Sequence, residues 1–265
     1  MMKALPQILA VLASSLTATA AMAQADAPPW SQADAYNDPQ EMAEARAAVQ
    51  EEHGAITAYY FLADRFEVQS GDGDPALFFE GQGWWGGDRN KLWLKTETEY
   101  SFEADEFEEA EVQALWSRAI SRYFDFQAGV RHDFTPDPSR TYAVLGVQGL
   151  APYWFEVDGA LFVSEKGDVS ARLEAEYDLM LTQRLILQPR AEADISFQTV
   201  DALAIGRGLS SVELGARLRY DIKREFSPYV GVNWSRDVGE TADFTRADGD
   251  DPSTLSFVAG LRFWF

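Results

Sequence analysis

The sequence of 265 residues contains no cysteine and only two histidines. Without cysteine it forms no disulfide, no thiolate metal site, no cysteine nucleophile and no lipid anchor attached at a cysteine. Basic residues are also scarce, because 22 Lys and Arg stand against 43 Asp and Glu, which gives a formal net charge of −21. Nucleic-acid binding needs a basic surface that displaces counterions from phosphates, so that class of function is excluded.

Long apolar runs are missing beyond the first residues of the chain. No later segment has the roughly 18 uncharged apolar residues that a membrane-spanning helix needs. At the N-terminus, Lys3 is followed by an apolar stretch and by the small-x-small pattern Ala21-Met22-Ala23. This arrangement predicts a signal peptide over residues 1–23 that is cleaved during export. The exported chain is then periplasmic, secreted, or an outer-membrane barrel.

Residues 24–54 differ from the rest of the chain and form a polar leader. Asp38 as the N-cap, Pro39 at the first helical position and Glu41 at the third predict one short helix, with a stop at Gly54. Its apolar stripe is thin, and an isolated helix of this length is marginally stable in water. A mobile leader is the simplest interpretation.

Residues 55–265 show a hydrophobic pattern with a period of two. Clear alternating runs occupy residues 153–163, 169–179, 185–195 and 212–220. Each is nine to eleven residues long, which suits a tilted strand that crosses a membrane. Alternation alone also fits a soluble β-sandwich, whose polar face meets water.

Three further features favour a membrane barrel over a sandwich. The polar face carries ionised groups of both signs on nearly every strand, as expected of an enclosed lumen. Aromatic residues stand at strand ends, as in the girdles of such barrels: Trp85, Tyr100, Trp116, Tyr123, Tyr153, Tyr177 and Tyr220. The chain ends on an alternating strand with a terminal Phe265, as bacterial barrels usually do. Lipid of the outer membrane is therefore an expected partner of the apolar face.

The predicted fold is all-β, a transmembrane antiparallel up-and-down β-barrel of about 12 strands preceded by a short leader helix. An even strand number keeps both termini on the periplasmic side. The longer connections are then expected to face outward, and they are Glu103–Glu108, Phe134–Arg140, Ser196–Gly208 and Asp237–Ser256.

Five long strings within the barrel region are distinctive. They are GQGWWGGDRNKLWLKTE (Gly81–Glu97), SRAISRYFDFQAGVRHDF (Ser117–Phe134), VLGVQGLAPYWFEVDG (Val144–Gly159), RLEAEYDLMLTQRLILQPRAE (Arg172–Glu192) and GLSSVELGARLRYDIKREFSPYVGVNW (Gly208–Trp234). Together they resemble the copper resistance protein B family of bacterial outer-membrane proteins, over roughly Phe61 to Phe265. The resemblance implies a role in copper tolerance, with copper ions as ligand and a periplasmic multicopper oxidase or copper carrier as partner. It leaves sequestration and outward passage as alternatives.

Candidate copper ligands are few. Many members of that family carry a Met- and His-rich segment before the barrel, whereas the leader here holds only Met42 and His53. Thioethers suit Cu(I) and imidazoles suit Cu(II). His132 and Asp133 complete the candidate set, and alternation with Val130 predicts that His132 points outward and Asp133 inward. Each histidine also has a structural interpretation, at a helix C-terminus or at the membrane interface.

The lumen is a second candidate site. The inward-facing charged residues are predicted to be Glu67, Glu80, Lys95, Glu97, Glu99, Arg131, Asp133, Glu156, Asp158, Arg172, Glu174, Glu176, Arg190, Glu192, Arg217, Arg219 and Arg262. Such groups either pair and brace the barrel or line a path for cations. Acidic outer loops would raise the local concentration of cations.

Three functions fit the sequence. The first is a copper-binding or copper-passing outer-membrane barrel, and the second is a passive or structural barrel without a specific copper site. The third is a soluble periplasmic binding protein. No enzyme is expected, because His132 is the only barrel histidine and no nucleophile motif accompanies it.

Overall fold

The computed structural model describes residues 31–53 and 56–265, so the predicted signal peptide and the predicted helix stop at Gly54 lie outside the described residues. The chain divides into two units, Met1–Ala55 and Ile56–Phe265. Within the described residues, no helix combines the length and the apolar character required to span a bilayer.

The first unit contains a short 3-10 helix, η2 (Gln32–Ala35), and the helix α2 (Pro39–His53). The Asp38 carboxylate accepts hydrogen bonds from the second and third backbone N–H groups of α2, at 2.8 and 3.2 Å. This confirms the predicted N-cap, which satisfies donors that have no partner inside the helix. An ion pair between Asp34 and Arg46 joins η2 to α2.

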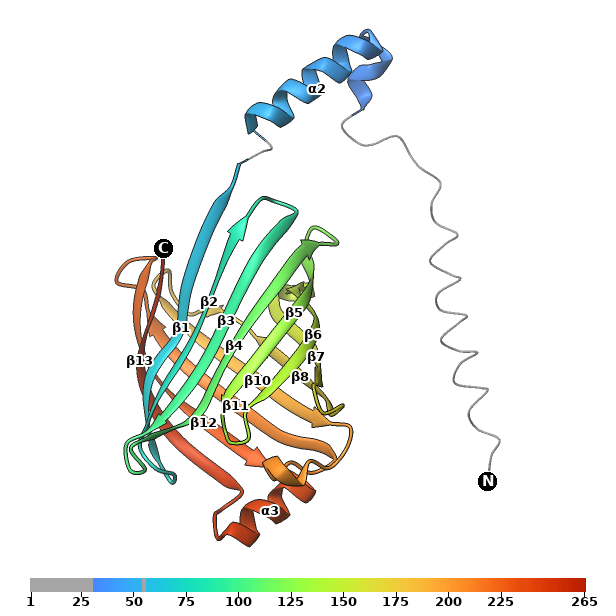
Figure 1. Ribbon diagram of the computed structural model, residues 1–265. Coiled ribbons are helices and arrows are strands. Elements are labelled where there is room, and N and C mark those ends of the chain that lie inside the picture. The colour runs from blue at the N-terminus through green and yellow to red at the C-terminus, as the bar shows by residue number, and fades with distance from the viewer. Residues whose placement is uncertain (1–30, 54–55) are drawn as a thin grey trace. The chain divides into compact units, whose positions relative to one another are not determined.

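The second unit is a closed antiparallel barrel of twelve strands within residues 56–265 (Figure 1). Each strand pairs with its neighbours in the chain, and the last strand pairs with the first to close the sheet. The strands are β1 (Ala58–Gly71), β2 (Ala76–Gly86), β3 (Asn90–Ser101), β4 (Glu106–Ala119), β5 (Phe124–Thr135), β6 (Arg140–Ala151), β7 (Phe155–Ser164), β8 (Val169–Glu176), β10 (Leu185–Ser196), β11 (Gly208–Tyr220), β12 (Phe226–Asp237) and β13 (Ser253–Trp264). The predicted fold class and strand number are confirmed.

The prediction missed an interruption of the strand that follows β7. It ends at Glu176 and resumes as the two-residue strand β9 (Leu179–Met180), which pairs only with β10. Pro189 of β10 lies beside the interruption, where its carbonyl accepts a hydrogen bond from the backbone N–H of Tyr177. Because proline has no N–H to donate in return, the ladder cannot continue regularly past it.

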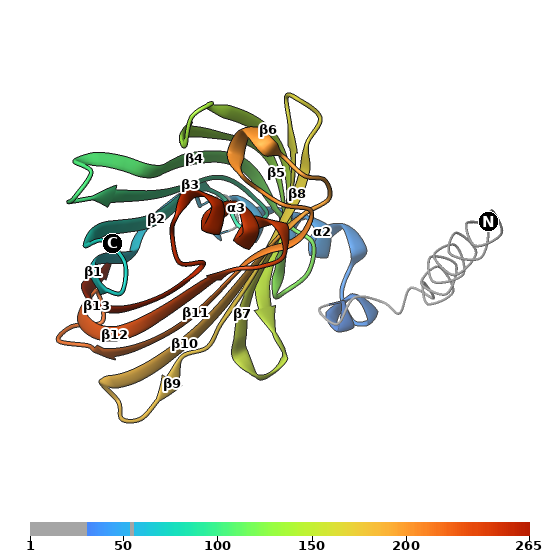
Figure 2. The same cartoon turned by 90° about the horizontal axis from the view of Figure 1, so that it is seen from below.

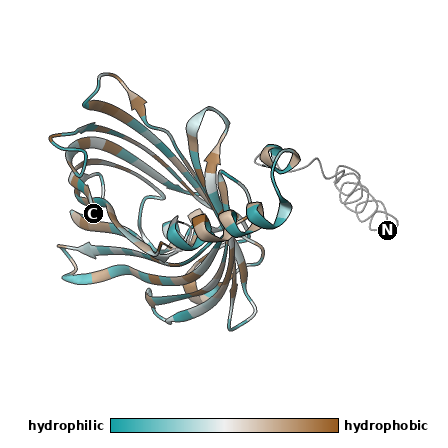
Figure 3. Cartoon of the chain, turned by 90° about the horizontal axis from the view of Figure 1, so that it is seen from above, coloured by the Kyte–Doolittle hydropathy of each residue, from teal (hydrophilic) through white to brown (hydrophobic). Residues whose placement is uncertain are grey.

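The two faces of the sheet have opposite polarity, and the usual soluble arrangement is inverted. Glu67 and Arg217 are buried, at 1% and 3% exposure, whereas Leu145 on the outer face is 54% exposed. Hydrophilic and hydrophobic residues alternate along the strands (Figure 3). Lipid is the environment that accommodates an apolar exterior around a charged interior.

A bulge in β1 changes which residues face the lumen. The pairing with β2 skips Asp64, so that Ala63 and Arg65 lie opposite successive residues of β2. Asp64 lines the interior cavity described below, and Arg65 and Glu67 are buried as well. A bulge adds one residue to a strand and shifts its alternation. As a result, two consecutive charged side chains of β1 enter the lumen.

The two longest connections, residues 197–207 and 238–252, lie at the same end of the barrel, opposite the start of β1, as predicted. The second contains α3 (Glu240–Asp248), which lies in front of the barrel opening in the view along its axis (Figure 2). The Glu240 carboxylate accepts hydrogen bonds from the Thr199 hydroxyl at 2.7 Å and the Arg207 backbone N–H at 3.2 Å. These bonds, that of Thr199 first, lower the pKa of Glu240.

The close contact between these two loops depends on Gly206. A Cβ atom at that position would lie 2.3 Å from the Cβ of Glu240, which no side chain tolerates. The backbone N–H of Gly206 also donates to the Thr241 hydroxyl at 3.0 Å. A small residue in one loop therefore lets α3 pack against the other.

We predict that arginine substitutions on the outer surface have effects that depend on depth. Leu145→Arg, in the middle of β6, should destabilise the barrel by about 2–4 kcal/mol, against about 0–1 kcal/mol for Ile120→Arg in a short turn. The two side chains are similarly exposed, at 54% and 59%, so exposure does not explain a difference. Urea titration of folding into lipid vesicles measures both values. Equal costs would mean that water covers both positions.

Candidate functional site: the charged lumen

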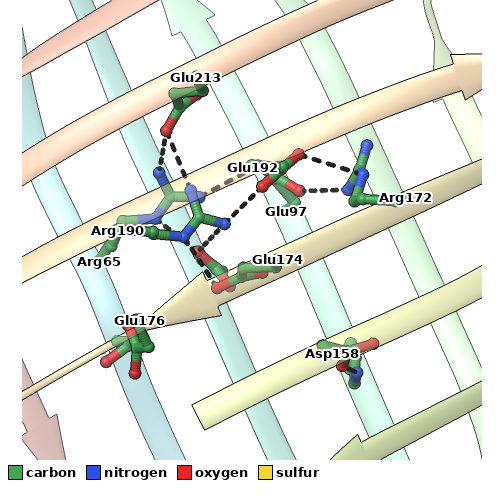
Figure 4. Close-up of polar contacts among 12 residues, drawn as sticks. Arg65, Glu97, Asp158, Arg172, Glu174, Glu176, Arg190, Glu192 and Glu213 are labelled. Atoms are coloured by element: carbon green, nitrogen blue, oxygen red, sulfur yellow. Dashed lines mark hydrogen bonds and ion pairs between the residues drawn. The ribbon is translucent and has the colours of Figure 1, made fainter. Parts of the chain in front are cut away.

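The middle of the lumen is crossed by a layer of ion pairs, which we call the septum. It consists of Arg65, Arg172 and Arg190 with the carboxylates bound to them, which are Glu80, Glu97, Glu111, Glu174, Glu192, Asp194 and Glu213. The close-up shows most of these side chains converging from several strands (Figure 4).

Arg190 of β10 contacts four carboxylates of the septum, as many as Arg172 does. Its guanidinium lies 2.8 Å from Glu174, 2.6 Å from Glu192 and 3.0 Å from Glu213. Arg65 of β1 shares Glu213 with it, at 3.1 Å. The planar fork of arginine allows several carboxylates to be bound at once. Two guanidinium groups are thus held close together by a common set of acids.

Further ion pairs lie on either side of the septum. Arg217 binds both oxygens of Glu67, at 2.6 and 2.8 Å, and Arg262 binds Asp64 at 2.5 Å. Lys95 pairs with Asp158. The pairs Glu67–Arg217 and Lys95–Asp158 connect strands that are not neighbours in the sheet, so they join separate parts of the wall and brace the barrel.

A cavity of about 600 Å³ lies between the septum and the end of the barrel that carries the short turns. Its walls include Asp88 and Arg122 in those turns and Glu97 and Arg172 in the septum. Acidic residues outnumber basic ones in its lining by ten to five. The cavity therefore has an excess of negative charge.

Two facing carboxylates in this cavity form no ion pair with a basic residue of the described chain. Glu156 of β7 and Glu176 of β8 lie directly opposite each other in the sheet, and both line the cavity. In the described part of the chain, neither forms an ion pair with a lysine or arginine, although Glu176 accepts a hydrogen bond from Gln188 at 3.0 Å. Like charges in such positions repel each other. A cation between them would relieve that repulsion.

Not all of the lumen is charged. Leu115, Val144 and Phe162 form a buried apolar cluster on its wall, with Trp93 packed against it. The Arg131 guanidinium lies 4.9 Å from the centre of the Phe162 ring, which places a cation over an aromatic face. One wall of the lumen is thus apolar.

His132 and Asp133 lie on opposite faces of β5, as predicted. The Nδ1 atom of His132 is 2.9 Å from the Thr141 hydroxyl, and its ring packs edge-on against Phe134 on the outer face. Asp133 is buried in the lumen, where both its oxygens accept hydrogen bonds from Arg131 at 2.6 and 3.0 Å. The two residues therefore do not converge on one metal ion.

Met42 and His53 both belong to α2, and His53 is its last residue. They are eleven positions apart, which corresponds to about 16 Å along a helix axis. The two positions cannot therefore bind the same ion while α2 is intact. A copper site at either one needs ligands from elsewhere.

In the described residues, Glu97, Glu109 and Glu111 form a group of three potential metal ligands, whose oxygen atoms lie within 4.8 Å of one another. Arg131 already contacts Glu111 at 2.6 Å, and Arg172 contacts Glu97 at 3.0 Å. Carboxylate oxygens are hard ligands, which suit Mg²⁺, Ca²⁺ or Mn²⁺ better than Cu(I). Two of these three carboxylates are therefore already bound by arginine.

The sequence prediction missed several members of the lumen. Glu111 and Glu213 follow the alternation of their strands, and the period-two pattern was sufficient to find them. Asp64 and Arg65 are different, because the bulge in β1 directs both inward and no simple period indicates that. Which acid binds which arginine depends on the tilt and register of distant strands, and the local sequence does not specify either.

Comparisons with known proteins identify the family. A family model described as Copper resistance protein B precursor matches residues 57–265. Copper resistance protein B of Escherichia coli is 44% identical over 213 residues, which cover 80% of this chain and 71% of that protein. A Copper resistance protein B homolog of Pseudomonas syringae pv. tomato (strain ATCC BAA-871 / DC3000) is also 44% identical over 213 residues, with 80% and 72% covered. The resemblance found in the sequence is confirmed.

One solved structure supports the same architecture. The NanC porin superposes with a TM-score of 0.50 at 13% identity, covering 78% of this chain and 99% of that chain. At so low an identity the likeness shows the fold alone. The predicted location in the outer membrane is confirmed by the family, whose members are outer-membrane proteins.

We predict that removing one partner of the buried pair Glu67–Arg217 destabilises the barrel strongly, whereas replacing both partners by apolar residues does not. Arg217→Ala should cost about 3–5 kcal/mol because it leaves a buried carboxylate uncompensated. Replacing both, as Glu67→Leu with Arg217→Met, should recover most of that loss. Arg246→Ala removes the exposed pair with Asp243 on α3 and should cost less than about 1 kcal/mol. Equilibrium unfolding in detergent measures all three, and similar costs for the two alanine variants would contradict the prediction.

Proposed function

We propose that this chain, which belongs to the copper resistance protein B family, passes copper ions through the acidic lumen of its barrel. Members of this family are outer-membrane proteins that act in copper resistance. For this chain, the excess of acidic over basic residues in the lumen cavity supports the proposal most directly. A negative, water-filled cavity with low-dielectric walls concentrates cations.

The types of ligand in the cavity favour passage over sequestration. Its lining residues include carboxylates and amides but no histidine, methionine or cysteine. Thiolates, thioethers and imidazoles are the groups that bind copper tightly. Conduction requires binding that is weak enough for the ion to leave. Carboxylates such as Glu156 and Glu176 meet that requirement for Cu(II).

The position of the cavity suggests where copper arrives. It lies at the end of the barrel that carries the short turns, which in outer-membrane barrels faces the periplasm. A periplasmic multicopper oxidase or copper carrier would deliver ions at this end. Met42, His53, His132 and Asp133 stay candidate ligands for copper outside this path.

A second function, a structural barrel without a copper site, is favoured by the septum itself. Arg65 and Arg190 are almost completely buried, and their ion pairs fill the middle of the lumen. A permanently closed barrel would pass no ions. The two functions differ in whether the cavity binds copper.

We predict that Glu156→Gln with Glu176→Gln weakens Cu(II) binding to the purified barrel by roughly tenfold, which corresponds to about 1.4 kcal/mol of lost attraction. Titration of the wild type and the double variant with Cu(II) and Cu(I) measures this effect. Glu165→Gln, in an exposed turn at the other end of the barrel, is the matched control and should bind copper normally.

Histidine variants test the remaining ligands in the same titration. His53→Ala and His132→Ala should leave the stoichiometry unchanged if copper binds in the cavity. If either variant binds fewer copper ions than the wild type, that histidine is a copper ligand. Equal binding by the wild type and the Glu156→Gln, Glu176→Gln variant would refute the cavity as the copper site.

A further inference from the structure

Two arginines of the septum bridge opposite walls of the lumen: Arg190 of β10 lies 3.9 Å from Glu80 of β2, and Arg172 of β8 makes a shorter contact. Arg172 projects from β8, and its Nη1 atom lies 3.0 Å from Glu97 of β3. Four strands separate β8 from β3 on one side of the barrel and six on the other, so these two strands belong to opposite walls. The Nε atom of Arg172 lies 3.1 Å from Asp194 and 3.2 Å from Glu192, both on the neighbouring strand β10.

The interior cavity ends at this contact. Its lining includes Glu97 and Arg172 but not Glu99, Glu109 or Glu192, which lie farther toward the long loops. Arg65, Arg190 and Glu111 are each less than 9% exposed at the same level of the lumen. The septum therefore separates a compartment at the short-turn end from the outer part of the lumen.

The acids on the wall facing Arg172 are mutually repulsive. Glu97 pairs in register with Glu111, and Glu99 pairs in register with Glu109, so four carboxylates lie on two adjacent strands. Like charges placed directly opposite destabilise a sheet. Arg172 contacts Glu97 and also lies 3.6 Å from Glu111. Its positive charge offsets repulsion that would otherwise draw water and cations into this level.

The energy of such a layer is finely balanced. Burying charged groups carries a large desolvation penalty, which their attraction offsets only when the geometry is good. Removal of one positive group from the septum leaves several carboxylates without a counter-charge. These carboxylates are more stable in contact with water than buried. A hydrated lumen then becomes the more stable arrangement.

We propose that the septum is a gate and that Arg172 is the residue that holds it closed. When Arg172 leaves Glu97 and Glu111, the two compartments join into one water-filled path. The carboxylates that remain give this path a preference for cations. The proposal concerns the regulation of the same lumen to which we assign copper passage, but the gate itself does not depend on which cation passes.

Single-channel recording in planar lipid bilayers with KCl tests the gate. The wild type should stay closed for most of the recording. Arg172→Ala should raise the mean K⁺ conductance on the order of tenfold or more, with reversal potentials that show cation selectivity. Arg172→Lys keeps the charge but loses the fork that contacts both walls, and it should give an intermediate conductance.

Arg246→Ala is the matched control, because it removes an arginine ion pair from α3 instead of the septum. It should conduct like the wild type. The different migration of boiled and unboiled samples on gels verifies that each variant is folded. If Arg172→Ala does not fold, the Arg172→Lys recording decides the question alone.

Three results would overturn the gate. They are a wild type that conducts as well as Arg172→Ala, folded Arg172 variants that stay as closed as the wild type, and an opened pore that selects anions. Failure of copper binding in the titration above would leave these K⁺ recordings unaffected. Failure of the gate would likewise leave the copper titration unaffected, so the two proposals are tested separately.

Discussion

The pairing of charges inside a barrel whose exterior lies in lipid is the constraint on which the structure depends. Each strand carries an apolar face and an ionised face, and only the apolar face is compatible with hydrocarbon. The ionised face must then be enclosed, where unpaired charges are costly. Arg190, with three carboxylates within 3.0 Å, shows how closely that requirement is met. The sheet can therefore close only if the charges that it encloses are paired.

The pairing of charges in the lumen is incomplete, because some carboxylates have no basic partner among the described residues. Glu156 and Glu176 line the interior cavity without a basic partner in the described residues. The same chemistry that braces the barrel at its middle thus provides a cation-attracting compartment beside it. In a family that acts in copper resistance, the charged residues of the lumen thus both stabilise the fold and attract cations.

The sequence predicted the barrel well because the signal for it is local. Period-two alternation, aromatic strand ends and the terminal Phe265 depend only on neighbouring residues, and twelve strands follow from them. The bulge at Asp64 and the interruption after Glu176 were missed because they depend on pairing with the next strand. The contact between Arg172 and Glu97 joins residues 75 positions apart, and only the closed, tilted sheet brings them together. For the same reason, the four candidate copper ligands were chosen by residue type, since their spatial neighbours were unknown.

The alternation of environments along one strand tests the account most directly. The chain has no cysteine, so single cysteines that replace Val230, Val232, Asn233 and Ser235 of β12 can each carry a spin label. In lipid vesicles, labels at Val230 and Val232 should be accessible to oxygen dissolved in the bilayer, and those at Asn233 and Ser235 should be shielded from it. Uniform access of a water-soluble nickel reagent to all four positions would contradict a lipid-covered exterior around a charged lumen.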